Sequence, residues 1–510
     1  MSAVKNALKL ADLDFPLERV PRSERVSLYR MLSGKPDPLQ IGIWKTELTS
    51  EEISSYHQVC GKTLGELGYS VTEPIDADKG INDGPLIRPG RAPIVKNVDR
   101  VLIQLPYRSV PGRNMLRENP LWNLFDICIV TLDNGVRGIG ETMVEYTHRQ
   151  VTDADIQFVM GQNAADVMWS DQVGCGLQQA LFDAVAKSLD VPLYALLGNK
   201  TKDKLQIGWW AIDMPSDDLR SEMNSAIAQG YTSMKMKGRP WFDLRQQLRA
   251  IADSAPKGFR IHVDFNELIT DAAAVKDYLN ILRDFPIVNI CEELIPQSNT
   301  NACRRLSARC DVAFARHVQS SQMIVKMASE AACDGVVLGR LGIAERLAQA
   351  SAAVASRIHI CNQQVGSSIT AAFALHCGAV MQGPSWPAIA CHNLYEEEVV
   401  RNRIEVDKGW ATIPEAPGIG VDIDMQALDR YAVRSGSNPI RRPEQLIVIT
   451  YPNGFSQDYT ETSVYWRDYA EGRMPSSNEG VVLEALVDDG SRAWRQRYGK
   501  ALLRAMSLRT

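Results

Sequence analysis

Thr232-Ser-Met-Lys-Met-Lys237 opens the stretch of sequence that decides the fold. Three similar runs follow it: Arg260-Ile-His-Val-Asp-Phe-Asn266, Val288-Asn-Ile-Cys-Glu-Glu293 and Asp311-Val-Ala-Phe-Ala-Arg-His317. Each run is short and mainly apolar, and each turns polar at its end. In a parallel barrel of strands and helices, the carboxyl ends of the strands meet on one face, where the chemistry takes place. The four runs therefore predict one pocket that gathers amines, acids, an amide and an imidazole.

The alternation of strand-like and helix-like sequence continues from Lys204 to about His376. Predicted strands are 206–211, 233–237, 260–264, 288–292, 312–315, 335–338 and 357–361, and predicted helices include 244–252, 272–283 and 343–356. Apolar strands that are separated by single helices pair in parallel through crossover connections. Because no glycine-rich nucleotide-binding motif accompanies them, we expect an α/β barrel rather than a doubly wound sheet.

Composition limits the class of protein. A chain of 510 residues is too long for one ordinary core, so two or more domains are expected. A net charge of −5 gives no basic surface for nucleic acid, and the ten cysteines include no Cys-x-x-Cys pair, which argues against a zinc or disulfide framework. The start of the chain has no apolar signal region, and no run of eighteen apolar residues follows. We therefore expect a cytoplasmic protein with no membrane partner.

Four regions follow from the changes in pattern. Residues 1–93 form an N-terminal extension with a helix at 51–67, residues 94–203 and 405–424 an α+β capping domain, and residues 204–404 the barrel. Residues 425–510 form a C-terminal α+β extension with a hairpin at 445–459, a strand at 480–487 and a helix at 492–506. We interpret this extension as an assembly or lid module, with aromatic residues that pack on the barrel or on a second subunit of a homo-oligomer.

Four motifs together resemble the enolase superfamily, and within it the mandelate racemase and muconate lactonizing branch. They are the helix and turn 180–198, Lys235-Met-Lys237, the acidic ends of the two following runs, and Pro417-Gly-Ile-Gly-Val-Asp-Ile-Asp424. The motifs keep the order of the family and span about two thirds of the chain. The resemblance implies a modified TIM barrel with an α+β capping domain and a divalent metal site.

The two lysines of the first run are the predicted catalytic amines. Positions i and i+2 of a strand point to the same face, so Lys235 and Lys237 are neighbours. Two adjacent ammonium groups disfavour double protonation, so the pKa of one of them should fall. A lysine with a lowered pKa removes protons from carbon, and we assign that role to Lys237. The alternative is a pair of solvated surface lysines.

The predicted metal ligands are Asp264, Glu292 and His317. The resemblance implies that the two acids hold Mg²⁺, which binds the substrate carboxylate and stabilises the enolate. The third ligand of the family is an acid, but His317 occupies the matching position here. Imidazole suits Mn²⁺ or Zn²⁺ better than Mg²⁺. Three alternatives stay open: the acids pair with the lysines, His317 acts as an acid–base group instead, or His317 is a structural histidine.

The opposite side of the predicted pocket lacks a second base. Residues 334–340 contain no lysine, and Asn362 stands where mandelate racemase relatives carry a histidine. Arg340 is a predicted clamp for an anionic group of the substrate, since guanidinium binds carboxylate in a bidentate manner. Further predicted substrate contacts are Asn266, Asn362, Tyr146, His148, Arg108, Arg113 and Arg117.

A one-base reaction is the function that this pattern favours. Lys237 would remove the α-proton of a hydroxy carboxylate such as an acid sugar, and His317 would help the hydroxyl group to leave. The expected partner is thus a small-molecule carboxylate, and the expected activity is that of a lyase. A cycloisomerase or racemase of the same superfamily is one alternative, and a binding or regulatory protein that has lost catalysis is another.

Overall fold

The computed structural model describes residues 93–434, 444–475 and 478–508. The predicted helix at 51–67, and the N-terminal extension apart from Pro93, lie outside these residues. Within them, no helix is both long and apolar enough to cross a lipid bilayer.

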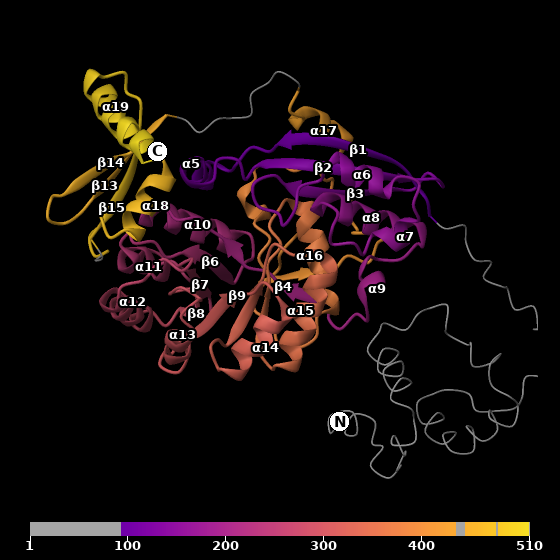
Figure 1. The fold of residues 1–510 in the computed structure, drawn as a ribbon, viewed down its shortest axis with the longest axis horizontal. Helices are drawn as coiled ribbons and strands as arrows, with labels where there is room; N and C mark the ends of the chain where they lie inside the picture. The colour runs from indigo at the N-terminus through magenta and orange to yellow at the C-terminus, as the bar shows by residue number, and fades with distance from the viewer. Residues whose placement is uncertain (1–92, 435–443, 476–477, 509–510) are drawn as a thin grey trace, which may run out of the picture. The chain divides into compact units, whose positions relative to one another are not determined.

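A parallel sheet of seven strands forms the centre of the fold (Figure 1), in the order β11-β10-β9-β8-β7-β6-β5. Its strands are β5 (Trp209–Trp210), β6 (Ser233–Lys237), β7 (Arg260–Asp264), β8 (Val288–Glu292), β9 (Ala313–His317), β10 (Gly335–Leu338) and β11 (His359–Asn362). The helices that connect or follow them are α10 (Ser216–Ala228), α11 (Leu244–Ala252), α12 (Ala272–Asp284), α13 (Thr300–Ser307), α14 (Ser321–Ser329), α15 (Ile343–Ala355) and α16 (Ser368–Val380).

Residues 384–389 close the sheet into a barrel. Trp386 N donates to the carbonyl of Ile360 in β11 at 2.8 Å, and Ala388 N donates at 2.8 Å to the carbonyl of Gln206, which lies three residues before β5. The segment therefore stands between the last and first strands of the sheet. The predicted barrel is confirmed, but this closing segment is missing from the predicted strands. It contains Pro384 and Pro387, which are residues that strand patterns exclude.

The predicted first barrel strand, 206–211, is two short strands in the structure. β4 (Lys204–Gln206) pairs antiparallel with β12 (Trp410–Thr412), whereas β5 pairs in parallel with β6. One apolar run thus contributes strands to two different sheets. The periodicity of the sequence alone does not show where one strand ends and the other begins.

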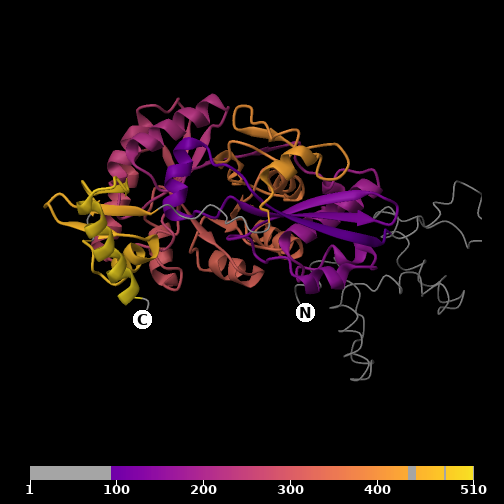
Figure 2. The same cartoon turned by 90° about the horizontal axis from the view of Figure 1, so that it is seen from above.

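The residues before the barrel form a three-stranded antiparallel sheet of β1 (Val95–Gln104), β2 (Leu124–Leu132) and β3 (Arg137–Met143), which Figure 2 shows from above. The helices of this region are α5 (Ser109–Glu118), α6 (Asp153–Val159), α7 (Ala164–Val167), α8 (Cys175–Ser188) and α9 (Tyr194–Leu197). Asp183 of α8 accepts hydrogen bonds from Ile139 N in β3 and from Ile419 N, both at 2.8 Å. One buried carboxylate therefore joins the sheet to the returning segment around residue 419.

After α17 (Met425–Tyr431), the last described residues form a small α+β module, here called the C-terminal module. It contains the antiparallel strands β13 (Gln445–Thr450), β14 (Ser456–Tyr459) and β15 (Val482–Val487), with helices α18 (Thr462–Ala470) and α19 (Arg492–Ser507). The predicted hairpin, third strand and terminal helix are confirmed. Helix α18 was not predicted, although two of its residues line the cavity described next.

Candidate active site

A cavity of about 1060 Å³ lies at the carboxyl ends of the barrel strands. Of the predicted site residues, those that line it are Lys237, Asp264, Asn266, His317, Arg340, Tyr146 and His148. Lys235, Glu292 and Asn362 do not line it. The strand ends thus meet on one face as the sequence predicts, but three of the predicted residues lie behind the cavity wall.

Lys235 is a buried structural cation rather than a free amine. Its Nζ donates to both carboxylate oxygens of Glu292, at 2.7 and 2.8 Å, and to Gln363 Oε1 at 2.9 Å, and it lies 3.3 Å from Asp264 Oδ2. Burial favours the neutral amine, but the charges of Glu292 and Asp264 outweigh it and raise the pKa of Lys235. The prediction that Lys235 is catalytic therefore lacks support from its contacts.

Lys237 is the amine that faces the cavity. Its Nζ donates to Asp264 Oδ2 at 2.7 Å and to Asn266 Oδ1 at 3.0 Å. Burial lowers the pKa of Lys237, and the positive charges of Lys235 and Arg239 lower it further against the effect of Asp264. The paired lysines therefore divide as expected: one is a fixed cation and the other is tuned towards the neutral base.

Glu292 lies between cationic and imidazole donors. Beyond Lys235, its oxygens contact His262 Nε2 at 2.5 Å and His317 Nε2 at 3.0 Å. Burial opposes ionisation, but the charges of Lys235 and His262 hold the pKa of Glu292 well below its ordinary value. The negative charge of Glu292 is thus already balanced by neighbouring side chains of the protein.

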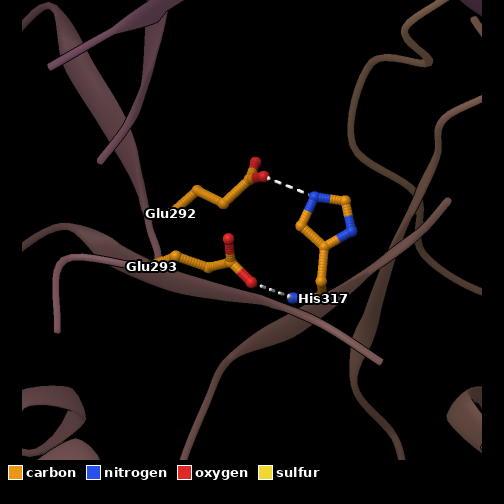
Figure 3. A group of neighbouring side chains, drawn as sticks. All are labelled: Glu292, Glu293 and His317. Atoms are coloured by element: carbon orange, nitrogen blue, oxygen red, sulfur yellow. Dashed lines mark hydrogen bonds and ion pairs between the residues drawn. The ribbon is translucent and has the colours of Figure 1, made fainter. Parts of the chain in front are cut away.

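Three possible metal ligands come together at the ends of β8 and β9: Glu292, Glu293 and His317 (Figure 3). One ligand atom from each lies within 4.8 Å of the others. Glu293 has a positive φ of 49° directly after β8, which turns it to the same side as Glu292. Burial, together with the negative charges of Asp264 and Glu292, raises the pKa of Glu293 to about 7. This set differs from the predicted one by having Glu293 in the place of Asp264, and the predicted set stays a prediction.

The donor set decides which ion fits. Lys235 bridges Asp264 and Glu292, and so stands where an ion bound to both acids would stand. The three-acid site for Mg²⁺ that the resemblance implies therefore does not fit these residues. Glu292, Glu293 and His317 offer two carboxylates and one imidazole, which suit Mn²⁺, Zn²⁺ or Fe²⁺ better. Burial is the main cause of the raised pKa of Glu293, and a cation bound beside it would favour its ionised form.

The wall opposite Lys237 is formed by Gln363, Arg340 and Tyr146. Gln363 Nε2 donates to the Tyr146 hydroxyl at 2.7 Å, and the Arg340 guanidinium lies 4.4 Å from the centre of the Tyr146 ring. Asn362 instead accepts from Arg346 Nη1 at 2.9 Å and donates to the Ala374 carbonyl at 3.0 Å. Gln363, rather than Asn362, is the amide that lines the cavity, and substrate binding by Asn362 stays a prediction.

The arginines predicted to contact substrate are engaged elsewhere. Arg108 and Arg113 pair with Glu222 and Asp218, and buried Arg117 pairs with Asp213 and Glu118. None of the three lines the cavity. Apart from Glu118, their carboxylate partners lie about a hundred residues away in the sequence, so local pattern does not reveal them. His148 does line it, and burial lowers its pKa to about 4, so its imidazole is neutral at pH 7.

Several cavity residues were not predicted. Arg239 lies two residues beyond Lys237, and the same i, i+2 relation that pairs the lysines would have pointed to it. Trp210 belongs to β5 and Asp213 follows that strand, whereas Thr462 and Trp466 come from α18. The latter two lie more than 200 residues from the lysines, and no spacing in the sequence connects them.

The fold and site define a capped parallel barrel with acid and amine groups at its strand ends. Residues 218–427 match the family described as enolase C-terminal domain-like. The predicted resemblance to the mandelate racemase and muconate lactonizing branch of the enolase superfamily is thereby confirmed.

Curated relatives include several enzymes. A chloromuconate cycloisomerase of Cupriavidus pinatubonensis is 26% identical over 292 residues, covering 52% of this chain and 74% of the relative. An o-succinylbenzoate synthase of Geobacillus kaustophilus is 25% identical over 52% of this chain and 72% of the relative. A D-galactonate dehydratase of Ralstonia nicotianae is 25% identical over 60% of this chain and 89% of the relative.

Solved structures agree on the fold. The muconate lactonizing enzyme from Pseudomonas putida superposes with a TM-score of 0.55 at 20% identity, covering 67% of this chain and all of that one. At that identity the likeness establishes the barrel and its cap, and it leaves the reaction open.

Proposed function

We propose that the protein is a lyase that removes the α-proton of a hydroxy carboxylate and expels a β-hydroxyl group as water. One observation carries the proposal: Lys237 lines the cavity, and its pKa is lowered by burial and by neighbouring positive charges. A lowered pKa increases the share of the neutral amine, and the neutral amine is the form that accepts a proton from a carbon acid. Relatives among the dehydratases, such as the D-galactonate dehydratase, support the substrate class.

The neighbours of Lys237 hold the base in place. Asp264 Oδ2 and Asn266 Oδ1 accept from its Nζ, which fixes the direction of the amine. Asn266 N donates to the other Asp264 oxygen at 2.9 Å, so the two acceptors form one rigid unit. Such a unit orients the lone pair of the neutral amine before substrate binds.

Glu292, Glu293 and His317 would hold a divalent ion beside the base. When bound, the ion would supply Lewis-acid stabilisation of the negative charge that develops on the substrate carboxylate. Arg340 is the proposed anchor for a second polar group, since its guanidinium lies over the Tyr146 ring at the opposite wall.

The departing hydroxyl group needs a proton. The two candidate donors are His317 and Lys237 itself, once Lys237 has taken up the α-proton. Burial would lower the pKa of His317, but its hydrogen bond to Glu292 and the charge of that carboxylate raise it. If His317 binds the ion, the protonated Lys237 returns the proton that it took from carbon. In both cases the proton and hydroxyl group leave as one water molecule, and no net proton is consumed.

The lack of a second base favours elimination over racemization. Across the cavity from Lys237, the polar ends of β10 and β11 are Arg340 and Gln363, and neither accepts a proton at neutral pH. A racemase needs acid–base groups on both faces of the substrate carbon. A cycloisomerase needs only one proton transfer, and the relatives of that class make it the second candidate.

Incubation with a panel of acid sugars and with muconate in deuterated water tests the proposal. We expect deuterium incorporation or release of a keto acid from an acid sugar, and loss of at least a hundredfold in rate with Lys237→Met. Lys326→Met on the exposed face of α14 is the matched control and should retain the rate. Turnover of muconate alone would favour the cycloisomerase, and activity that survives Lys237→Met would refute the assigned base.

A further inference from the structure

One wall of the active-site cavity is built by the C-terminal module. Thr462 and Trp466 of α18 line the same cavity as Lys237 and Asn266. The match to the enolase family ends at residue 427, before the module begins. This wall therefore comes from outside the family-matched part of the chain.

Buried contacts fix α18 against the barrel and the cap. The Tyr465 hydroxyl donates to Glu118 of α5, and both side chains are buried. The Trp241 ring, which follows β6, lies 4.8 Å from the ring of Tyr465 and 5.2 Å from that of Trp466. Clustered aromatic rings at these separations are held by both burial and ring geometry. The position of Trp466 in the cavity wall is therefore set by the fold.

Trp466 connects the module to the base. The guanidinium of Arg239 lies 4.9 Å from the centre of a Trp466 ring. Arg239 Nη2 donates to Asn266 Oδ1 at 2.7 Å, and the same oxygen accepts from Lys237 Nζ at 3.0 Å. No carboxylate among the described residues lies within ion-pair distance of Arg239, which is only 3% exposed. A buried guanidinium in a cavity wall thus faces the cavity without a counter-ion.

Three buried polar atoms of this wall have no hydrogen-bond partner within the described part of the chain: Asp213 Oδ1, Arg239 Nε and Trp466 Nε1. Nearly all buried polar atoms in folded proteins are hydrogen-bonded, and each one that is not destabilises the fold. All three residues line the cavity, so a bound molecule becomes the partner of these atoms once the side chains that cover them turn aside to admit it.

The chemistry of the three atoms selects the ligand. One is an anionic acceptor and two are donors. A hydroxyl group both donates and accepts, so neighbouring hydroxyls satisfy the whole set. A second carboxylate would be repelled by Asp213, and an apolar end would leave all three atoms unpaired. The cavity volume of about 1060 Å³ is at the upper end of ligand pockets, which leaves space beyond the reacting carbons.

We infer that Asp213, Arg239 and Trp466 form a distal subsite that binds hydroxyl groups at the remote end of an acid-sugar substrate. The inference rests on the proposed function, which places the reacting carboxylate beside Lys237. The C-terminal module is then a specificity element of the active site, with Trp466 both closing the wall and holding Arg239.

Calorimetric binding to the full chain tests the subsite, with five- and six-carbon aldonates as long probes and 2-hydroxypropanoate as the short one. Trp466→Phe keeps an aromatic ring beside Arg239 and removes Nε1 together with the five-membered ring that carries it. We expect it to weaken binding of the best aldonate about five- to tenfold and to leave 2-hydroxypropanoate within twofold. Trp410→Phe, at a tryptophan that is 43% exposed and outside the cavity, is the matched control and should change neither.

The outcomes separate the subsite from the reaction. The subsite is overturned if no aldonate binds more tightly than 2-hydroxypropanoate, if Trp466→Phe leaves aldonate binding unchanged, or if it weakens both probes equally. Deuterium exchange by the unmodified protein is measured in parallel. Selective loss of aldonate affinity in Trp466→Phe, without any deuterium exchange by the unmodified protein, would refute the proposed reaction and keep the subsite. Exchange that Lys237→Met abolishes, together with unchanged aldonate binding in Trp466→Phe, would support the reaction and refute the subsite.

Discussion

The Lys235 ammonium lies 2.7 and 2.8 Å from the two carboxylate oxygens of Glu292, and both side chains are at most 1% exposed. Two buried opposite charges at this distance depend on each other, since either one alone would be an uncompensated charge in a poorly polar interior. This relationship explains why one lysine of the pair is fixed and why the other is left to act in the cavity.

Lys235→Met is accordingly expected to destabilise the protein by about 3–5 kcal/mol, because it leaves Glu292 buried without its main cation. Urea unfolding followed by circular dichroism measures the change. The double variant Lys235→Met/Glu292→Gln removes both charges and should recover part of the loss. A single variant as stable as the parent protein would contradict the role given to Lys235.

Lys237 gives the reaction its pH dependence. Only the neutral amine accepts a proton, so the exchange rate should rise with pH and level off above the pKa of Lys237. Because the positive charge of Arg239 contributes to the lowered pKa, Arg239→Met should move the rising limb of the profile to higher pH. Rates of deuterium exchange across a pH series measure this shift. A profile that stays in place, or moves to lower pH, would contradict the electrostatic role of Arg239.

The same pKa affects stability. Since the pKa of Lys237 is lower in the folded protein than in the unfolded chain, the unfolded chain binds more protons between the two values. The free energy of unfolding should therefore rise with pH across that window, and Lys237→Met should remove this component of the rise. Equal slopes for the two proteins in urea unfolding at several pH values would show that Lys237 is not perturbed.

The buried acid Glu398 is expected to give the opposite dependence of stability on pH. Glu398 accepts from Ser368 N and Oγ at the start of α16, and burial raises its pKa to about 8. A carboxyl group with a raised folded pKa stabilises the fold at low pH, and that contribution is lost as the pH rises from about 4.5 through 8. Glu398→Gln should flatten this fall and leave the protein more stable than its parent at pH 9. Thermal unfolding at pH 5 and pH 9 tests it, and a variant that is less stable at pH 9 contradicts it.

Sequence patterns located the barrel because its strands repeat one local signature. The bounds of β6, β7, β8 and β10 agree with the predicted ranges residue for residue. Each is a short apolar run with a polar end, and burial on both faces makes such runs easy to recognise. The predicted strand before His317 began one residue early and stopped two residues short, because Arg316 and His317 look polar although they belong to β9.

The rest of the site depends on contacts between distant residues. Asn362 and Gln363 are equally plausible in sequence, and only the end of β11 decides which amide reaches the cavity. Trp466 approaches Arg239 across more than 200 residues, through a helix that the pattern did not predict. The i, i+2 relation identified the lysines, whereas tertiary packing alone determines the partners of the arginines and the wall formed by α18.

The predicted metal ligands differ in one residue from the set of possible ligands that the structure brings together. If Glu292, Glu293 and His317 hold the ion, Glu293→Gln should weaken Mn²⁺ or Zn²⁺ binding at least tenfold, because it removes one negative ligand from a set of three. Asp264→Asn should weaken it less, since Asp264 is paired with Lys237 and Lys235 and lies outside that set. Titration calorimetry of the metal-free protein with each ion measures both variants. The reverse order would return Asp264 to the ligand set and require Lys235 to move from between the two acids. The affinity for Mg²⁺ is the informative comparison. A site that contains imidazole should bind Mg²⁺ more weakly than Mn²⁺, whereas a site of acids alone should show a smaller difference between the two affinities.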